Sequence, residues 1–307
     1  MAGVIQRPAR FAKRYTRTDR GLAGMNRSGL RKAHMTLHIV DELIHERAPK
    51  LVRSPAWPVV RPVLYTVLGR NKAVRMADAI AGMAGPEALD YVSDLLSLEV
   101  AAPHLDRLPA SGRCLMVCNH PTGIADGIAV YDAILRRRPD AIFFANADAL
   151  RVNPRFAEAL IPVEWVEAKR TREKTRLTLQ GAKDAFERER CVVMFPAGRL
   201  ARRNAKGQLI DPPWAPTAVS LAQKYAAPIV PVHVAGPDSV WFHLFNRFSQ
   251  ELRDITLFHE LLNKAGKRFD LTVGPLIDPQ AEGLETERLK AYVELQLPET
   301  PDKVFHA

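Results

Sequence analysis

The chain has 307 residues, of which 47% are hydrophobic and 25% are charged, so it can bury the core of one large domain, alone or with an appendage. Its net charge of +10 favours an anionic partner: nucleic acid, an acidic substrate or an anionic membrane surface. No stretch of about eighteen apolar residues occurs, and we expect no transmembrane helix. Cys114, Cys118 and Cys191 lie in apolar runs, which is typical of reduced core residues in a cytoplasmic protein and argues against disulfides or a zinc site.

The N-terminal region is rich in arginine. Residues 1–28 contain few large apolar side chains, so we expect a basic, flexible arm, and no apolar core follows that would make it a secretory signal. Residues 29–48 have helical periodicity, with Leu37, Val40 and Ile44 on one stripe. A second stripe has a spacing that could ligate a metal ion but more often marks a solvated helix face, and we predict no metal site. This stripe consists of His34, His38, Asp41 and His45.

Residues 29–97 are predicted to form a helical subdomain. An apolar run contains Trp57 and Tyr65, and two helices are expected over 71–83 and 86–98. The second of these helices carries Leu89, Val92, Leu95 and Leu96 on one face. The subdomain either packs on the main sheet or forms an amphipathic platform at a membrane interface, and the two aromatic side chains suit both interpretations.

From residue 98 to residue 307, short apolar runs alternate with amphipathic segments. The expected strands are 98–102, 114–118, 141–145, 161–166, 191–195, 228–234 and 269–273. The expected helices are 127–137, 154–160, 172–189 with Leu179, Ala182 and Phe186 inward, 215–226, 239–248, 254–265 and 283–296. Alternation of apolar strands with helices predicts an α/β domain with a largely parallel or mixed central sheet flanked by helices.

One stretch of this domain combines a strand end with two polar side chains. The run 114–118 ends in Asn119 and His120, a turn containing Pro and Gly follows, and Asp126 stands at the expected N-cap of the next helix. Ligands usually bind at strand ends in open α/β sheets. If the loop folds back, Asp126 can hold the tautomer of His120 and make it a general base for a hydroxyl or water nucleophile. Otherwise His120 is a polar loop residue and Asp126 only caps the helix.

A second polar segment follows the strand 191–195. It reads Pro-Ala-Gly-Arg, in which Gly198 exposes backbone amides and Arg199 can clamp a phosphate. Two parallel strands would bring this segment to the sheet edge that carries His120. The basic cluster that begins there is either a lipid-headgroup contact or a solvated loop, and it consists of Arg199, Arg202, Arg203 and Lys206.

Two other strands end near further polar groups. Lys169, Arg170 and Arg172 follow the strand 161–166, and three basic groups at one sheet edge favour an anionic substrate. His233 is brought toward the same region, where a role in the core is favoured over a supporting role in the site.

These motifs occur in an order that resembles a known family. Asn119-His120-Pro, Asp126-Gly, a basic segment, Phe195-Pro-Ala-Gly-Arg199 and then Ala-Pro-Ile-Val-Pro-Val follow the order seen in the glycerolipid acyltransferases. Over roughly residues 90–280 the chain resembles this PlsC-like, lysophosphatidate acyltransferase-like superfamily, and within it a bacterial hemolysin-like branch.

The resemblance implies an O-acyltransferase, similar to 1-acylglycerol-3-phosphate acyltransferases, that acts in membrane lipid synthesis. It would move a fatty acyl group from acyl-CoA or acyl carrier protein to the hydroxyl of a lysolipid, without a further cofactor. His120 matches the catalytic His that deprotonates the acceptor hydroxyl, and Asp126 matches the Asp that orients it. The predicted substrate-binding residues are Arg199, Gly198, Lys169, Arg170, Arg172 and Asn119.

The sequence departs from the family pattern in two places. Five residues separate His120 from Asp126 instead of the usual four, a longer loop that the similar bacterial branch shares. Ala197 stands where the family usually has Glu, and Arg199 stands where it usually has Thr. The replacement of Glu by Ala197 removes a carboxylate that the family uses in glycerol-phosphate recognition. A lyso-aminolipid or another lysolipid is therefore an alternative acceptor to lysophosphatidate.

Two other function classes remain open on the sequence alone. The charge of +10 fits a non-catalytic protein that binds anionic membrane or nucleic acid, although no nucleic-acid motif is present and we expect no such partner. A hydrolase could use His120 to activate water, although no Gly-x-Ser-x-Gly elbow supports the serine version. For the acyltransferase, we expect a cytoplasmic protein bound peripherally to anionic lipid at the inner face of the cell membrane.

Overall fold

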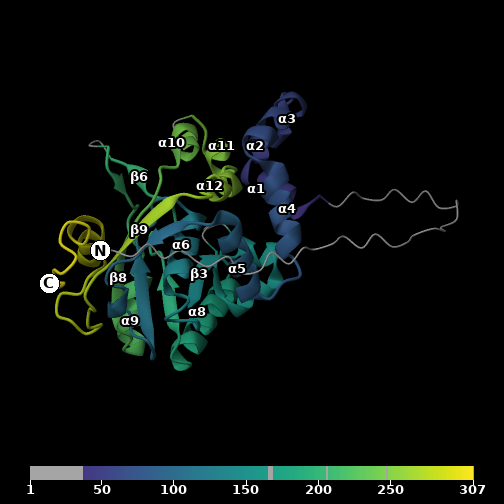
Figure 1. The fold of residues 1–307 in the computed structure, drawn as a ribbon. Coiled ribbons are helices and arrows are strands. Elements are labelled where there is room, and N and C mark those ends of the chain that lie inside the picture. Colours follow the sequence, from purple (N-terminus) through teal and green to yellow (C-terminus); the bar gives the residue numbers. More distant parts are fainter. Residues whose placement is uncertain (1–36, 165–168, 205–206, 247, 307) are drawn as a thin grey trace, which may run out of the picture.

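The protein is built around a seven-stranded sheet with the strand order β1-β9-β8-β2-β5-β3-β4 (Figure 1). The computed structural model describes residues 37–164, 169–204, 207–246 and 248–306. The strands of the sheet are β1 Glu99–Ala101, β2 Cys114–Cys118, β3 Ile142–Asn146, β4 Leu160–Val163, β5 Cys191–Met194, β8 Ile229–Ala235 and β9 Arg268–Val273. A separate two-stranded hairpin, which the sequence did not predict, joins β6 (Arg202–Arg203) to β7 (Leu209–Ile210).

Most of the sheet is parallel. β8, β2, β5, β3 and β4 pair in parallel, whereas β9 is antiparallel to β8 and carries β1 at the sheet edge. All five residues of β2 are buried, as expected for a central strand covered on both faces. The predicted α/β fold, with a largely parallel or mixed sheet between helices, is thus confirmed. Because β2 and β5 are parallel neighbours, the segments that follow them leave the same edge of the sheet.

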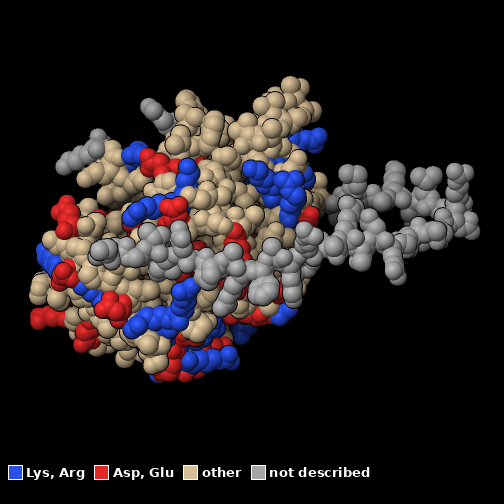
Figure 2. Space-filling view, in the orientation of Figure 1, with Lys and Arg blue, Asp and Glu red and all other residues tan. Residues whose placement is uncertain are grey.

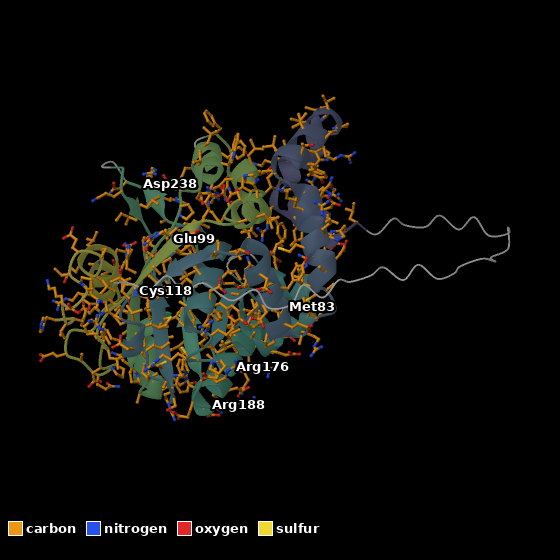
Figure 3. The ribbon with its side chains drawn as sticks, in the orientation of Figure 1. Met83, Glu99, Cys118, Arg176, Arg188 and Asp238 are labelled. Carbon is orange, nitrogen blue, oxygen red and sulfur yellow. The ribbon has the colours of Figure 1, made fainter. Side chains whose placement is uncertain are left out.

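Helices cover both faces, and alternate residues of β2 point into two different apolar clusters. Met116 packs with α5 (Gly85–Leu96), α6 (Ile124–Ile134) and α12 (Leu257–Leu262) on one face. Leu115 and Val117 pack with the helices of the other face. Those helices are α8 (Arg172–Glu187), α9 (Thr217–Tyr225) and α13 (Thr286–Ala291), which runs into a π-helical turn, Tyr292–Gln296. Figure 3 shows Arg176 and Arg188 along α8 on the outside of this second layer.

The helices before β1 pack against one another and against the sheet domain. They are α1 (Ile39–Arg47), α2 (Pro49–Arg53), α3 (Trp57–Val67) and α4 (Arg70–Ile80), followed by α5 on the sheet face described above. Val40, Trp57 and Leu64 lie in an apolar cluster that we call the helical cluster. Trp57 is only 7% exposed and meets the ring of Tyr65 edge-on, so these aromatics belong to a core and not to an exposed interface. The division at residues 97 and 98 stays a prediction.

Two connections between elements of the sheet domain contain short helices. Helix α7 (Asp148–Val152) and a 3-10 turn, Pro154–Glu158, link β3 to β4. Helices α10 (Val240–Asn246) and α11 (Gln250–Asp254) link β8 to α12.

Several expected positions were wrong, either in where a helix begins or in which of its faces is buried. Helix α6 begins at Ile124 and not at residue 127, because Gly123 turns the chain with a φ of 102° and serves as N-cap. Asp126 therefore lies within the first turn and is not the N-cap. Leu179 is 51% exposed, because the buried face of α8 is formed by Ala182, Ala185 and Phe186.

Two other leucines that were expected on buried stripes are also exposed. Leu37 precedes the N-cap of α1, and Leu95 lies at the margin of the inner face of α5; their exposed fractions are 46% and 42%. Their neighbours on the same stripes, Val40, Leu89 and Val92, are buried as predicted.

Some predictions concern residues outside the described part of the chain: the basic arm 1–28, His34 and Lys206. Within the described ranges, His38 bonds to Asp78 and Asp41 pairs with Arg70. No group of three or more His, Cys, Asp or Glu side chains in those ranges is arranged to hold a metal ion. Among the described helices, none combines the length and hydrophobicity needed to cross a membrane.

Candidate active site

His120 and Asp126 meet at the carboxyl end of β2. The loop between them folds back, so that His120 Nδ1 lies 2.9 Å from Asp126 Oδ2. This separation is within the range of a strong hydrogen bond between a general base and its orienting carboxylate. The loop of five residues therefore retains a His–Asp pair.

The loop itself fixes the carboxylate of Asp126. Oδ2 also accepts hydrogen bonds from the backbone N–H groups of Thr122, at 2.9 Å, and Gly123, at 3.0 Å. Oδ1 accepts a hydrogen bond from the hydroxyl of Thr122. Asp126 is fully buried, so these donors replace the water that an ionised carboxylate would otherwise require.

The carboxylate determines which nitrogen of His120 can act as a base. An ionised carboxylate only accepts hydrogen bonds, so Nδ1 carries the proton and Nε2 keeps its lone pair. No hydrogen bond to any described residue occupies Nε2. The ring is 17% exposed and lies against Phe195, with ring centroids 4.7 Å apart. The pair thus has the geometry of a general base with one free nitrogen.

A second carboxylate, Asp211, holds the backbone of His120. Both of its oxygens accept the N–H of His120 at 3.1 Å, and Oδ2 also accepts the indole N–H of Trp214 at 2.9 Å. The carbonyl of His120 accepts the N–H of Ala201 at 2.9 Å. The end of β2 is therefore tied to the loop that follows β5.

Burial raises the pKa of Asp211 to about 7. The Trp214 indole opposes this rise by hydrogen bonding, and the nearby carboxylate of Glu294 adds to it. Sequence reasoning missed Asp211. The signal that could have found it is the run Leu209-Ile-Asp211-Pro-Pro-Trp214, in which an acidic residue ends an apolar pair and precedes a Trp.

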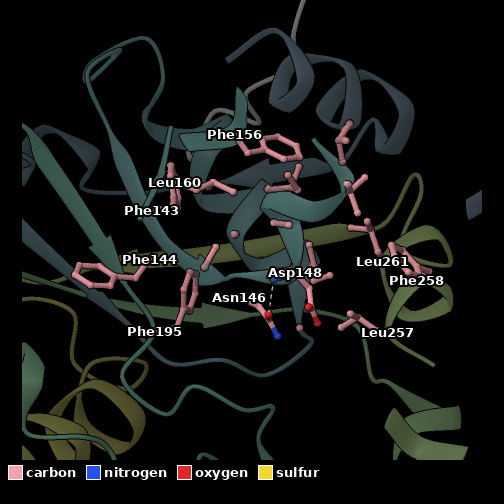
Figure 4. A pocket seen from close by; sticks show the side chains of 18 of the residues that line it. Phe143, Phe144, Asn146, Asp148, Phe156, Leu160, Phe195, Leu257, Phe258 and Leu261 are labelled. Atoms are coloured by element: carbon pink, nitrogen blue, oxygen red, sulfur yellow. Dashed lines mark hydrogen bonds between the residues drawn. The ribbon is translucent and has the colours of Figure 1, made fainter. Parts of the chain in front are cut away.

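An apolar cavity of about 290 Å³ opens beside the His–Asp pair (Figure 4). His120 and the glycines Gly123 and Gly127 lie along its wall. Most of the remaining lining is aliphatic or aromatic and includes Phe143, Phe156, Leu160, Leu257, Phe258 and Leu261. The polar groups Asn146 and Asp148 stand together in this wall, where the N–H of Asp148 donates to the amide oxygen of Asn146 at 2.8 Å. Such a cavity suits an alkyl chain better than a polar ligand.

Gly198 and Arg199 line the same cavity as His120, as their parallel strands predict. Gly198 has a φ of 61° and its N–H donates to the carbonyl of Phe195 at 3.0 Å, which makes a tight turn after β5. Arg199 is exposed and forms no ion pair within the described part of the chain. Its guanidinium is available for an anionic group of a ligand.

The other predicted substrate-binding residues lie elsewhere. The buried amide of Asn119 bonds at both ends to the backbone of Val234, so this placement supports a positioning role and not substrate binding. Lys169 pairs with Glu46 at 2.8 Å. Arg170 and Arg172 line a separate basic groove between α8 and α9 together with Arg176, Lys183 and Lys224.

His233 is largely buried, and its Nδ1 lies 3.0 Å from the carbonyl of Val293. Burial lowers its pKa, which favours the neutral ring. His233 thus has the core role that the sequence favoured.

The chain resembles known proteins over much of its length. Residues 86–292 match a family model described as Acyltransferase. The chain is 26% identical to the lyso-glycine lipid O-acyltransferase of Phocaeicola vulgatus over 196 residues, which cover 62% of this chain and 68% of that protein. It is 23% identical to the lyso-glycine lipid O-acyltransferase of Bacteroides thetaiotaomicron over 241 residues, which cover 76% of this chain and 86% of that protein.

A solved structure of the 1-acyl-sn-glycerophosphate acyltransferase PlsC from Thermotoga maritima is 16% identical to this chain. Its TM-score is 0.41, and the match covers 83% of this chain and 92% of that chain.

The α/β fold, the oriented histidine and the apolar cavity beside it have the arrangement of a general base next to room for an apolar ligand. The family match extends over most of this fold and includes His120, Asp126 and Arg199. The chain belongs to the acyltransferase family. It is an acyltransferase, as the resemblance carried by the motifs implied.

Proposed function

We propose that this acyltransferase moves a fatty acyl group from an acyl thioester to the hydroxyl of a lysolipid. The observation that carries the proposal is the His120–Asp126 pair, joined at 2.9 Å, at the wall of an apolar cavity of about 290 Å³. The pair supplies a base for a hydroxyl, and the cavity supplies room for an alkyl chain.

In the proposed reaction, Nε2 of His120 takes the proton of the acceptor hydroxyl while its oxygen attacks the thioester carbonyl. Asp126 keeps Nδ1 protonated and stabilises the imidazolium that forms. Collapse of the tetrahedral intermediate forms the ester bond and breaks the C–S bond, and the proton on Nε2 passes to the departing thiolate. The donor is acyl-CoA or an acyl carrier protein, both of which are cosubstrates, and the reaction uses no resident metal or cofactor.

The acceptor is a lysolipid with an anionic headgroup that Arg199 contacts. Arg199 lines the cavity together with His120, and a guanidinium binds a phosphate or carboxylate in bidentate fashion. The names of two relatives support a lyso-aminolipid over lysophosphatidate. Ala197 at the position of the family's usual Glu supports the same choice.

The enzyme works at an anionic membrane surface in this proposal, at the inner face of the cell membrane and in the synthesis of membrane lipids. A lysolipid acceptor resides in such a surface, and the net charge of +10 favours one that contains anionic lipid.

The test combines the purified enzyme with an acyl thioester and a lysolipid and measures thiol release and the new ester product. His120→Ala should abolish both, whereas His306→Ala, which removes an exposed histidine outside the site, should leave both unchanged. Thermal unfolding of each variant verifies that it is folded. Thiol release without an ester product would identify a hydrolase, and full activity of His120→Ala would overturn the mechanism.

A further inference from the structure

Two helices that are far apart in the sequence expose apolar faces with the same spacing. The exposed large apolar side chains of α3 are Val59, Val60, Val63 and Val67. Those of α10 and the turn after it are Val240, Trp241, Leu244 and Phe248. Each set follows the spacing i, i+1, i+4, i+8, which is one helical stripe on α3; on α10 the first three side chains form such a stripe and Phe248 follows in the turn. Val59 and Phe248 are 78% and 76% exposed. Apolar side chains that are exposed together in this way mark an interaction surface more often than apolar residues scattered singly over the surface do.

The inner faces of the same two helices pack into one core. Trp57 and Leu64 of α3 and Phe245 of α10 all contact the helical cluster. Glu251 of α11 also accepts the backbone N–H groups of Lys50, at 3.0 Å, and Leu51, at 2.8 Å. Since α11 packs on α10 and α2 packs on α3, these bonds fix the two helices in one frame, and α3 and α10 lie on the same side of the sheet domain (Figure 1).

The charge around this side of the molecule indicates what covers it. Between residues 49 and 77 the sequence contains six basic residues and no Asp or Glu. They are Lys50, Arg53, Arg61, Arg70, Lys72 and Arg75. All except Arg70 are exposed, and none of those five forms an ion pair within the described ranges. Figure 2 shows uncharged side chains over the tips of α3 and α10, with Lys and Arg gathered beside α3 and α4. Apolar stripes bordered by unpaired cations match the interface of an anionic bilayer.

The helical cluster also connects these stripes to the candidate active site. Phe258 packs against the helical cluster and lines the cavity that contains His120. Leu257 and Leu261 of the same helix line that cavity too. A bilayer that contacts α3 and α10 would therefore be connected to the cavity through the packed side chains of the helical cluster.

We propose that α3 and α10 form a two-part docking face for an anionic lipid bilayer, with their valine, Trp241 and Phe248 side chains inserted at the boundary between headgroups and acyl chains. The inference rests on the proposed lysolipid acceptor, because it states how that acceptor reaches the cavity from the membrane. The part contributed by α10 is essential, since a single stripe of valines on α3 offers no aromatic anchor.

Vesicle sedimentation tests the face directly. The variants are Trp241→Ser with Phe248→Ser on α10 and Val59→Ser with Val63→Ser on α3. The matched control is Leu177→Ser with Leu179→Ser, because both leucines are 51% exposed on α8, outside this face. Each of the first two variants should bind vesicles of mixed anionic and zwitterionic phospholipid about tenfold or more weakly, and the control should bind like the wild type. Purely zwitterionic vesicles should bind the wild type weakly.

Two further readouts separate this proposal from others. Activity on a short-chain, water-soluble lysolipid should be unchanged in the α10 variant, and His120→Ala should bind vesicles normally. Vesicle binding without any acyl transfer would thus refute the proposed function alone. Unchanged vesicle binding by the α10 variant would overturn the docking face. If that variant also converted a dimer to a monomer, the face would be identified as a contact between copies of the chain.

Discussion

Asp126→Asn should remove the negative charge beside His120 while keeping the loop in place. The amide oxygen can replace Oδ2 and accept from His120 Nδ1, Thr122 N and Gly123 N. The amide NH₂ then takes the position of Oδ1, where the hydroxyl of Thr122 can turn from donor to acceptor. The substitution therefore isolates the charge of the carboxylate from its geometry.

The size of the effect follows from Coulomb's law. An imidazolium and a carboxylate whose charge centres are ~4 Å apart attract each other by about 4 kcal/mol at an effective dielectric constant of ~20. This attraction exists only once His120 has taken the proton, so it stabilises the transition state and not the ground state. A loss of that size lowers kcat about 10³-fold.

The assay is steady-state thiol release with saturating acyl thioester and lysolipid. We expect kcat to fall about 10³-fold and the KM for either substrate to change little, with thermal unfolding near that of the wild type. A decrease in kcat of less than about tenfold in a folded variant would refute the role of Asp126, because the charge would then contribute little to catalysis.

Three other substitutions give distinct results. Asp211→Asn removes a carboxyl group whose pKa is raised by burial from 3.8 to about 7. Between these pH values the folded wild type holds a proton that the unfolded chain has lost, so the free energy of unfolding of the wild type falls as the pH rises. Denaturant titrations from pH 4 to pH 8 should show a smaller fall in the variant, and parallel curves would contradict the argument. Arg199→Met should raise the KM for an anionic acceptor at least about tenfold with less effect on kcat, whereas Arg170→Met, in the separate groove, should not. Ala149→Phe narrows the cavity and should shift donor preference to shorter acyl chains, which a chain-length series would measure.

The strands of the sheet could be predicted because they have a recognisable pattern in the sequence. Buried parallel strands read as continuous apolar runs, and β2 and β9 were located to within a residue of their observed bounds. Parallel pairing then requires His120 and Arg199 to share an edge, and they line one cavity. Local sequence pattern and topology were sufficient for this part of the site.

The rest depended on contacts between distant segments. Asp211 reaches His120 across 91 residues, and the local run around Asp211 marks this residue without showing which distant segment it contacts. The start of α6 was misplaced because Gly123, and not Asp126, provides the helix N-cap. Lys169 was expected at the substrate but forms an ion pair with Glu46 of α1. The order of the strands alone does not reveal this partner, because it belongs to a helix that precedes the sheet domain.

The most direct test of the proposed function follows acyl transfer in a single vessel, with a labelled acyl thioester, a lysolipid and the enzyme. We predict one mole of free thiol for each mole of labelled ester formed with the wild type, and neither product with His120→Ala at the same protein concentration. Labelled ester formed at the wild-type rate by a folded His120→Ala enzyme would contradict the assignment of His120 as the base.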